Sequence, residues 1–340
     1  MRHTITAVNT AITAVVALLS FGTGDAVRAA DYYKDKTITV NVGYKPGGSA
    51  DADARLIAKH LGKHIPGNPN IIVQNRPGGG GVRAINYAYN RAEPDGLSVF
   101  QLGSAHYLQQ LAGSKAVKFD VSKMPILGAW TKSSYVLAIR SDKYANFEAI
   151  KNAKVLPKIA DKGTGSGTAV MTVAWQKGLN IKLDVLPGYG SSESSLAVER
   201  GEADGRTLGV SGILRRSPHW ISKNFAPPVV QAGPKRDPRI PDVPTVYDLN
   251  PNPGKFYRTV NEGLAFSRPY ALPPKTSSEP VGILRTAWGK MLKDDAFHAD
   301  LKKRKWTFVP TPHDEVEKFY QEVMKDASPD VVKDLKKLFP

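Results

Sequence analysis

The sequence of 340 residues contains no cysteine. A chain without cysteine forms no disulfide, has no thiolate nucleophile, builds no cysteine-ligated zinc site and carries no lipid on an N-terminal cysteine. Beyond residue 30 it also lacks any apolar run close to the ~18 residues that a membrane-spanning helix needs. These absences exclude a disulfide-stabilised scaffold and a thiol enzyme, and they predict a soluble protein.

Residues 1–30 resemble a secretory signal peptide. Arg2 precedes an apolar stretch over residues 11–21, and Val27-Arg28-Ala29 forms a small-residue cleavage site. The alternative, a buried first helix, is disfavoured because glycines and a polar break follow the stretch. We expect cleavage near Ala30 or Asp31, and the ~310 residues that remain are more than one hydrophobic core usually supports. Two lobes are therefore expected.

Acidic residues are in the minority. The chain has 47 Lys and Arg against 31 Asp and Glu, a formal net charge of +16. Such an excess attracts anionic partners. Nucleic acid is disfavoured, because basic runs such as residues 302–305 resemble a solvated helix face without the aromatic residues that stack on bases. A small anion fits the composition better.

The stretch over residues 37–61 is typical of a strand, a glycine turn and a helix. Apolar and polar residues alternate over 37–42, and apolar residues recur at helical spacing up to Leu61. Adjacent glycines leave backbone N–H groups free to face an anion at the start of the helix, although glycines can also serve the turn alone. The candidate binding residues here are Tyr44, Lys45, Gly47, Gly48, Ser49 and Asp51.

The same pattern of strand, glycine loop and helix recurs twice. A strand over 155–160 leads into the loop 163–168, and a strand over 181–186 leads into the loop 187–192. Because parallel strands end at the same edge of a sheet, these loops are expected to share a cleft with the first one. Their candidate binding residues are Gly165, Ser166, Gly167, Thr168, Tyr189, Gly190 and Ser191.

Two single side chains complete the candidate site. His106 follows a predicted strand over 97–102 and is well placed to face the cleft. Arg206 stands at the mouth of a predicted strand over 207–210, where its planar fork suits a carboxylate. The alternative for Arg206 is a surface position or an ion pair with Glu202 or Asp204.

Catalysis and metal binding are weakly supported. An exported serine hydrolase would use Ser166 or Ser191 as nucleophile and would need a base aimed at it. The glycine loops match neither a phosphate-binding loop nor a nucleophile elbow nor a dinucleotide fingerprint. His60 and His64 share a helix face, but two ligands without a third predict no metal site. We expect no enzyme activity, no cofactor and no metal.

Six motifs in order carry a family resemblance: PGGSADADAR (46–55), NRPGGGG (75–81), PDG (94–96), the glycine loop 163–168, GEADG (201–205) and RDPRIPDVPTVYDL (236–249). With them, the chain resembles the substrate-binding receptors of tripartite tricarboxylate transporters, the Bug or TctC family. The resemblance implies an α/β, two-lobed periplasmic binding protein fold of the venus-flytrap, type II-like kind, each lobe a mainly parallel sheet flanked by helices. It places residues 31–131 and 251–340 in lobe one and residues 132–250 in lobe two.

The resemblance also implies a function. A periplasmic, monomeric receptor would capture a small organic carboxylate (a di- or tricarboxylate or an aromatic acid) through backbone amides and water, and deliver it to membrane permease subunits. Feeding a sensor protein is the alternative. The chain departs from the family pattern at Lys45, where proline is usual, at Ala169, where histidine is usual, and at Arg206, where an apolar residue is usual. The loop 187–190 also departs from the usual Pro-Tyr-Lys-Gly.

Overall fold

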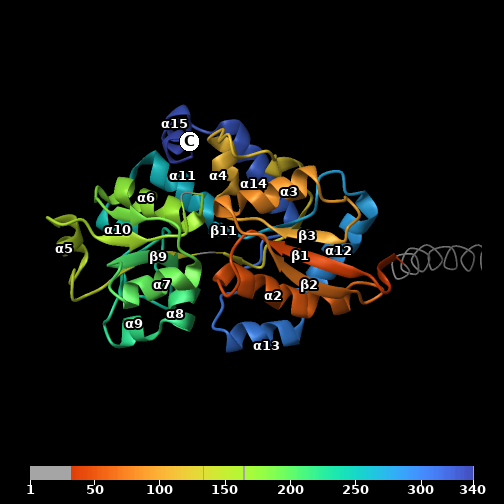
Figure 1. Cartoon of the computed structure of the whole chain (residues 1–340), viewed down its shortest axis with the longest axis horizontal. Helices are drawn as coiled ribbons and strands as arrows, with labels where there is room; N and C mark the ends of the chain where they lie inside the picture. Colours follow the sequence, from red (N-terminus) through yellow and green to blue (C-terminus); the bar gives the residue numbers. More distant parts are fainter. Residues whose placement is uncertain (1–31, 133, 164, 340) are drawn as a thin grey trace, which may run out of the picture.

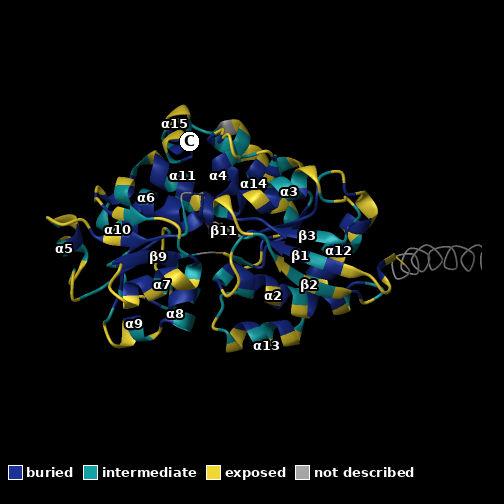
Figure 2. Cartoon of the chain, viewed as in Figure 1, coloured by how far each residue is buried: buried dark blue, intermediate teal, exposed yellow. Residues whose placement is uncertain are grey.

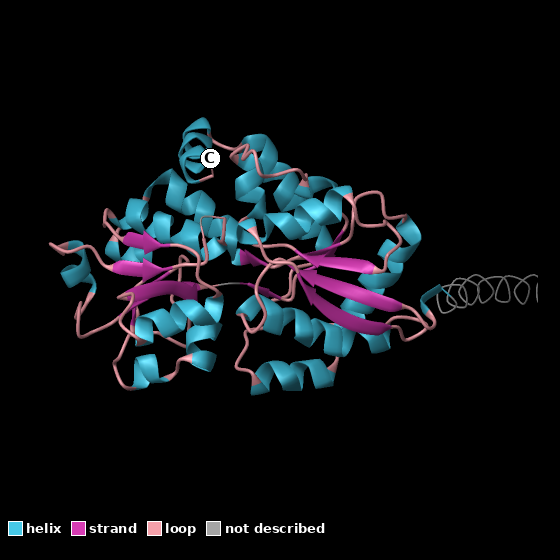
Figure 3. Cartoon of the chain, in the orientation of Figure 1, coloured by secondary structure: helices cyan, strands magenta, loops and turns pink. Residues whose placement is uncertain are grey.

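Two α/β lobes make up the molecule, each built on a five-stranded sheet flanked by helices (Figures 1 and 3). The computed structural model describes residues 32–132, 134–163 and 165–339, so the predicted signal peptide lies outside the described residues. The expected two-lobed α/β fold is confirmed. In the described part of the chain, no helix is both long and apolar enough to cross a membrane.

The first sheet has the order β2-β1-β3-β12-β4. Strand β1 pairs in parallel with β2 and β3, and β12 is antiparallel to β3 and β4. The predicted alternation is present in β1, where Ile38, Val40 and Val42 are fully buried. The bounds are β1 Thr37–Val42, β2 Asn70–Asn75, β3 Ser98–Gln101, β4 Ile126–Gly128 and β12 Tyr270–Ala271.

The second sheet has the order β10-β6-β9-β7-β8. Strand β7 is parallel to β8 and β9, whereas β6 is antiparallel to β9 and β10. In each sheet four strands thus run in one direction and one strand, β12 or β6, runs in the other, so both sheets are mainly parallel, as predicted. The bounds are β6 Tyr135–Ile139, β7 Lys158–Ala160, β8 Asp184–Leu186, β9 Gly205–Gly209 and β10 Pro228–Gln231.

Strand β7 is shorter than the sequence pattern predicts. It begins at Lys158 instead of residue 155, and Val155 and Leu156 are exposed. Pro157 has no N–H to donate to a neighbouring strand, which accounts for the late start.

Helices cover both sheets, and their buried faces point inward while their outer faces are exposed (Figure 2). Around the first sheet lie α2 Ser49–Leu61, α3 Val82–Asn90, α4 His106–Leu111, α12 Ser278–Met291, α13 Asp295–Lys303 and α14 His313–Asp326. Around the second lie α5 Phe147–Lys151, α6 Gly167–Leu179, α7 Ser191–Glu199, α8 Val210–Arg216, α9 His219–Ser222, α10 Val246–Leu249 and α11 Gly254–Ala265, and α15 Pro329–Leu338 packs on both α11 and α4.

A small two-stranded sheet lies between the lobes. Strands β5 (Thr131–Lys132) and β11 (Phe266–Ser267) pair antiparallel and lead the chain from one lobe to the other (Figure 1). Further along the chain, α11 packs on α6, and the Asn250 side-chain amide donates a 2.7 Å hydrogen bond to the Gly178 carbonyl. The lobe boundaries at residues 131 and 250 stay a prediction, and α11 beyond the second boundary lies against the second lobe.

Candidate ligand-binding cleft

The loops after five parallel strands, β1, β2, β7, β8 and β9, reach the space between the lobes. There they line two adjoining cavities. The arginine cavity, of about 70 Å³, is lined by Lys162, Arg206, Arg215, Arg216 and Arg268 among others. The glycine cavity, of about 270 Å³, is lined by residues 43–45, 48–50, 77–80 and 188–191, and by Lys162. Ser49, Lys162 and Ser191 line both cavities.

The glycine cavity is lined by seven of the fifteen binding residues that the sequence predicts. They are Tyr44, Lys45, Gly48, Ser49, Tyr189, Gly190 and Ser191. Gly78, Gly79 and Gly80 complete its wall with positive φ angles of 146°, 56° and 65°. Only glycine adopts such a run at little cost, so the wall consists of bare backbone.

The two lobes touch directly across the cleft. The Lys45 ammonium lies 2.9 Å from the Glu193 carboxylate, and the Ser192 hydroxyl donates a 3.2 Å hydrogen bond to the Gly47 carbonyl. Farther in, the Gln109 amide donates to the Gly165 carbonyl at 2.8 Å. These contacts join the first and second lobes, so the structure shows the closed arrangement of the cleft.

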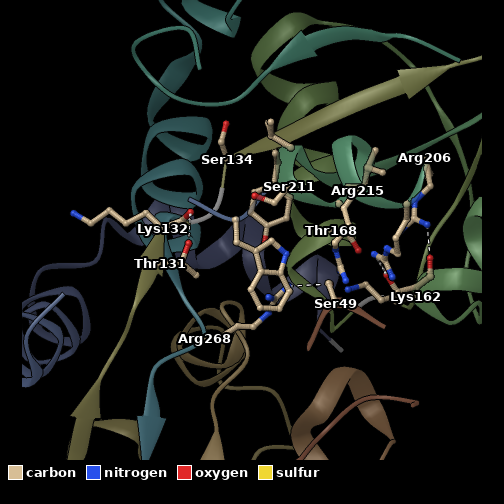
Figure 4. A pocket seen from close by; sticks show the side chains of 18 of the residues that line it. Ser49, Thr131, Lys132, Ser134, Lys162, Thr168, Arg206, Ser211, Arg215 and Arg268 are labelled. Carbon is tan, nitrogen blue, oxygen red and sulfur yellow. Dashed lines mark hydrogen bonds between the residues drawn. The ribbon is translucent and has the colours of Figure 1, made fainter. Parts of the chain in front are cut away.

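Arg206 lies at the wall of the arginine cavity and is 2% exposed. Its Nη1 donates to the Ser191 carbonyl and, at 2.7 Å, to the Ser195 hydroxyl. Among the described residues it forms no ion pair with Glu202 or Asp204, which were the alternative partners. Arg216 joins it through a 3.1 Å hydrogen bond from Nη2 to the Ser191 hydroxyl. Figure 4 shows Arg206, Arg215 and Lys162 gathered on one side of the cavity.

Arg268 comes from the first lobe and is held by a buried carboxylate. Asp53, which is fully buried, accepts hydrogen bonds from Arg268 Nη1 at 3.2 Å, Trp130 Nε1 at 2.9 Å and the Tyr270 hydroxyl at 2.6 Å. Arg268 Nη2 also donates to the Ser49 hydroxyl at 3.0 Å. Asp53 therefore orients the guanidinium toward the cleft, next to the first glycine loop.

Aromatic rings close the cavity on the side of β5. The Arg215 guanidinium lies 5.0 Å from the Trp306 ring centroid, within the range of a cation–π contact. Trp306 in turn packs on Trp130 with 5.2 Å between ring centroids. Because Arg215 belongs to α8 and Trp306 follows α13, this contact also joins the lobes.

Positive charge dominates the arginine cavity. Burial, together with the nearby Arg268, lowers the pKa of Lys162 to about 7, and burial lowers the pKa values of Arg206 and Arg216 to about 10. Burial disfavours the charged form of a basic group, so each of these side chains would gain from an anion beside it. None of the described residues that line this cavity is an aspartate or glutamate.

Several predicted residues support the loops instead of lining the cavities. Asp51 accepts hydrogen bonds from the Gly47 amide and from Arg55, both at 3.0 Å, and fixes the first loop. Ser166 caps α6 through a 3.2 Å bond from the Ala169 amide. Gly165 meets the first lobe across the cleft, and Gly167 begins α6. Thr168 does line the arginine cavity.

His106 lies behind the glycine wall, contrary to the expectation that it faces the cleft. Its Nδ1 accepts a 3.0 Å hydrogen bond from the Gly103 amide, so the proton on Nε2 faces the Gly80 carbonyl at 3.3 Å. The ring is buried, and burial lowers its pKa to about 4. His106 is thus a neutral support for the turn at residues 79–81.

The burial of His106 predicts a loss of stability in acid. Its folded-state pKa of about 4 lies below the unfolded value of 6.5, so its contribution is complete above pH 6.5 and is lost as the pH falls toward 4. We expect the free energy of unfolding to fall by about 3 kcal/mol more in the native protein than in His106→Gln between pH 7 and pH 4. Denaturant titrations of both proteins measure this difference, and parallel pH profiles would contradict it.

The two serines considered as hydrolase nucleophiles contact other side chains. The Ser166 hydroxyl is fully buried and contacts Asp161 at 3.3 Å, and the Ser191 hydroxyl accepts a bond from Arg216. Among the described residues no histidine contacts either hydroxyl. His60 and His64 each contact a separate aspartate, Asp300 at 2.9 Å and Asp294 at 2.8 Å. Within the described ranges, no group of three His, Cys, Asp or Glu side chains could hold a metal ion.

The cationic and aromatic residues of the arginine cavity that the sequence did not single out are Trp130, Lys132, Tyr135, Lys162, Arg215, Arg216, Arg268 and Trp306. Lys162 stands between a strand and a predicted glycine loop, and residues 215–216 form a basic pair shortly after the strand that carries Arg206. From these two positions in the sequence, Lys162 and the basic pair could have been predicted to lie near the cleft.

Comparison with known proteins agrees with this architecture. A sequence profile described as the tripartite tricarboxylate transporter family receptor matches residues 54–336. A Cupriavidus necator protein, the UPF0065 protein in the gbd 5' region, is 27% identical over 86% of this chain and 85% of its own length.

Two solved structures from Rhodopseudomonas palustris share the fold. MatC with bound malate superposes with a TM-score of 0.70 at 18% identity, over 90% of this chain and 99% of its own. A second protein with adipate gives a TM-score of 0.70 at 16% identity, over 89% of this chain and 96% of its own. Because the family profile spans most of the sequence, the chain belongs to the family of tripartite tricarboxylate transporter receptors.

Proposed function

We propose that this protein is a periplasmic receptor that binds a small organic carboxylate between its lobes and delivers it to membrane permease subunits of a tripartite transporter. The observation that carries the proposal is the arginine cavity, an interlobe site lined by basic residues and by none of the described acidic ones. Relatives of the same fold that hold malate and adipate support a carboxylate ligand. The match to a receptor family, together with the buried Ser166 and the arginine-bound Ser191, supports binding without turnover.

Both lobes would contribute to binding. The first lobe offers the Ser49 hydroxyl, the backbone of residues 78–80 and the Arg268 guanidinium. The second lobe offers Arg206 and Arg216, whose planar forks match a carboxylate in two-point contact. A ligand that touches both sets holds the lobes together, which is the basis of capture.

A thermal-shift screen of carboxylates, sugars and amino acids tests the ligand class. A ligand that binds only the folded protein raises its stability, so at least one group of carboxylates should raise the melting temperature. A shift from a sugar or a cation, with none from any carboxylate, would refute the proposal.

Replacing Arg206 should weaken dicarboxylate binding. We expect Arg206→Ala to reduce the affinity for the best dicarboxylate roughly tenfold to a hundredfold, because a charge-assisted contact of about 1.5–3 kcal/mol is lost. A monocarboxylate should lose much less. Calorimetry on both ligand types measures the effect, with Arg200→Ala as the control because Arg200 is 68% exposed and pairs with Glu202. Equal losses for both ligands, or none, would remove Arg206 from the site.

Binding should also take up a proton at Lys162. Its pKa of about 7 leaves it mostly neutral at pH 8, and a carboxylate placed beside it favours the charged form. We therefore expect the affinity to fall roughly threefold to tenfold per pH unit between pH 7 and pH 9. Calorimetry in buffers of different ionisation enthalpy counts the protons, and Lys162→Met should abolish the uptake. Unchanged uptake in that variant would assign the proton to another group.

A further inference from the structure

The charge around the arginine cavity is larger than one carboxylate can balance. Six basic residues line it: Lys132, Lys162, Arg206, Arg215, Arg216 and Arg268. Two of them have a carboxylate partner, Arg268 with Asp53 at 3.2 Å and Lys132 with Glu315 at 3.8 Å. Asp161, buried next to Lys162 in the chain, is the carboxylate whose charge acts on both Lys162 and Arg206. Six cations against three carboxylates leave an excess of three positive charges when Lys162 is protonated, and an excess of two at pH 8, where Lys162, with a pKa of about 7, is mostly neutral.

Donors that need an acceptor lie in the same place. Among the described residues, Arg206 Nε, Arg215 Nε and Arg216 Nη1 are buried and have no hydrogen-bond partner. A buried N–H of a charged group costs free energy unless an acceptor satisfies it. Three such donors on three arginines of β9 and α8 therefore point to an oxyanion, whose oxygens have lone pairs enough for all three, and the excess of positive charge favours two negative charges over one.

The excess positive charge lies in the arginine cavity and not in the glycine cavity. Lys132 points away from the arginines in Figure 4, whereas Arg206, Arg215 and Lys162 gather together. Ser49, Lys162 and Ser191 line both cavities, and the glycine cavity has no basic residue besides Lys45 and Lys162 among the described residues that line it. Lys45 is already paired with Glu193 across the mouth of the cleft. One end of a ligand thus meets concentrated charge and the other meets backbone and the Tyr44 and Tyr189 side chains.

We infer that the ligand carries a head group with two negative charges, which binds in the arginine cavity, and a less charged body that extends past Ser49 and Ser191 into the glycine cavity. This inference rests on the proposed function and adds the charge and polarity of the ligand to it. The head is a compact oxyanion, either a phosphonate or phosphate group or two carboxylates on neighbouring carbons. In this arrangement Arg216 binds the second negative charge. Its Nη2 already donates to the Ser191 hydroxyl, whereas its Nη1 has no hydrogen-bond partner among the described residues.

Two matched pairs of acids test the head group by calorimetry at pH 8. Phosphonopropionate and succinate share a two-carbon spacer and differ in the charge of one end, so this pair tests the phosphonate head alone, because succinate itself has two carboxylates on neighbouring carbons. Tricarballylate is glutarate with one more carboxylate on the middle carbon, so this pair tests the head made of neighbouring carboxylates. We expect at least one acid with a doubly charged head to bind ten times or more as tightly as its partner acid, since each charge-assisted contact adds about a factor of ten or more.

The variants Arg216→Met and Arg216→Lys show whether the gain arises in this cavity. Arg216→Met should reduce the gain to about threefold or less, and Arg216→Lys, which keeps the charge without the fork, should leave an intermediate gain. Arg236→Met serves as the control for net charge, because Arg236 is half-exposed and pairs with Asp248 outside both cavities. Thermal unfolding of each variant verifies that it is folded. If Arg216→Met does not fold, the comparison with Arg216→Lys alone tests the inference.

The outcomes separate the inference from the proposed function. A gain for phosphonopropionate alone assigns a phosphonate or phosphate head, and a gain for tricarballylate alone assigns neighbouring carboxylates. Succinate and glutarate binding as tightly as their partners, or a gain that survives both Arg216 variants, overturns the inference and leaves the receptor function standing. If none of the four acids nor any other carboxylate binds, the proposed function fails and the inference fails with it.

Discussion

Gly80→Ala should weaken ligand binding about a hundredfold while the protein remains folded. A Cβ at Gly80 would lie 2.7 Å from the Cα of Gly165, which belongs to the other lobe. The backbone atoms of Gly165 cannot move aside as the end of a flexible side chain can. The added methyl group therefore prevents the two lobes from closing fully. A ligand that binds only the closed form loses affinity in proportion to the fraction of closed molecules, and a clash of about 3 kcal/mol gives the expected factor.

Gly113→Ala is the matched control. Gly113 has the same φ of +65° as Gly80 and lines neither cavity, so alanine costs a similar amount of backbone strain, about 1–2 kcal/mol, at either position. A Cβ at Gly113 would meet nothing within 4 Å. Both variants should therefore lose similar stability, and only Gly80→Ala should lose affinity. Calorimetry that finds equal affinities in the two variants would show that this contact is not needed for capture.

Asp53→Asn should lower the free energy of unfolding by about 3–5 kcal/mol, because it leaves the Arg268 cation in the protein without its buried partner. Asp53 is fully buried and also accepts from Trp130 and Tyr270, so the amide cannot satisfy every donor. The affinity should fall too, since Arg268 loses the contact that orients it toward Ser49. Denaturant titration and calorimetry measure the two effects.

Two further variants distinguish a broken ion pair from general disruption. Asp51→Asn lies on the same helix, and its partner Arg55 is 54% exposed, so it should cost only about 1 kcal/mol. The double variant Asp53→Leu with Arg268→Met removes both charges and should be more stable than Asp53→Asn. If Asp53→Asn is as mild as Asp51→Asn, the buried network does not support the site.

Local sequence patterns were sufficient to predict the loops of the cleft. The alternation in β1 and the glycines after it depend on neighbouring residues only, and parallel strands then bring their ends together. The glycine cavity accordingly contains Tyr44, Gly48, Tyr189 and Gly190, all predicted from such loops. The lobe boundaries and any contact with a ligand stay predictions.

The cationic wall could not be predicted in the same way. Arg268 and Trp306 reach the cleft through the crossing strands and the C-terminal segment, so their proximity depends on tertiary structure that no short pattern encodes. Arg215 and Arg216 stand in the last turn of α8, where basic residues are common because they complement the helix dipole. For His106 a local pattern was misleading. Its position after β3 suggests a side chain in the cleft, but its ring points toward Gly103 and Gly80 instead.

A crystal structure with the tightest-binding carboxylate tests the central claim most directly. We expect closed lobes, with carboxylate oxygens of the ligand within hydrogen-bond distance of Arg206 or Arg216 and with the rest of the ligand against residues 78–80 and 188–191. A ligand bound on the outer surface, or one in the cleft whose acidic groups contact neither arginine, would contradict the account.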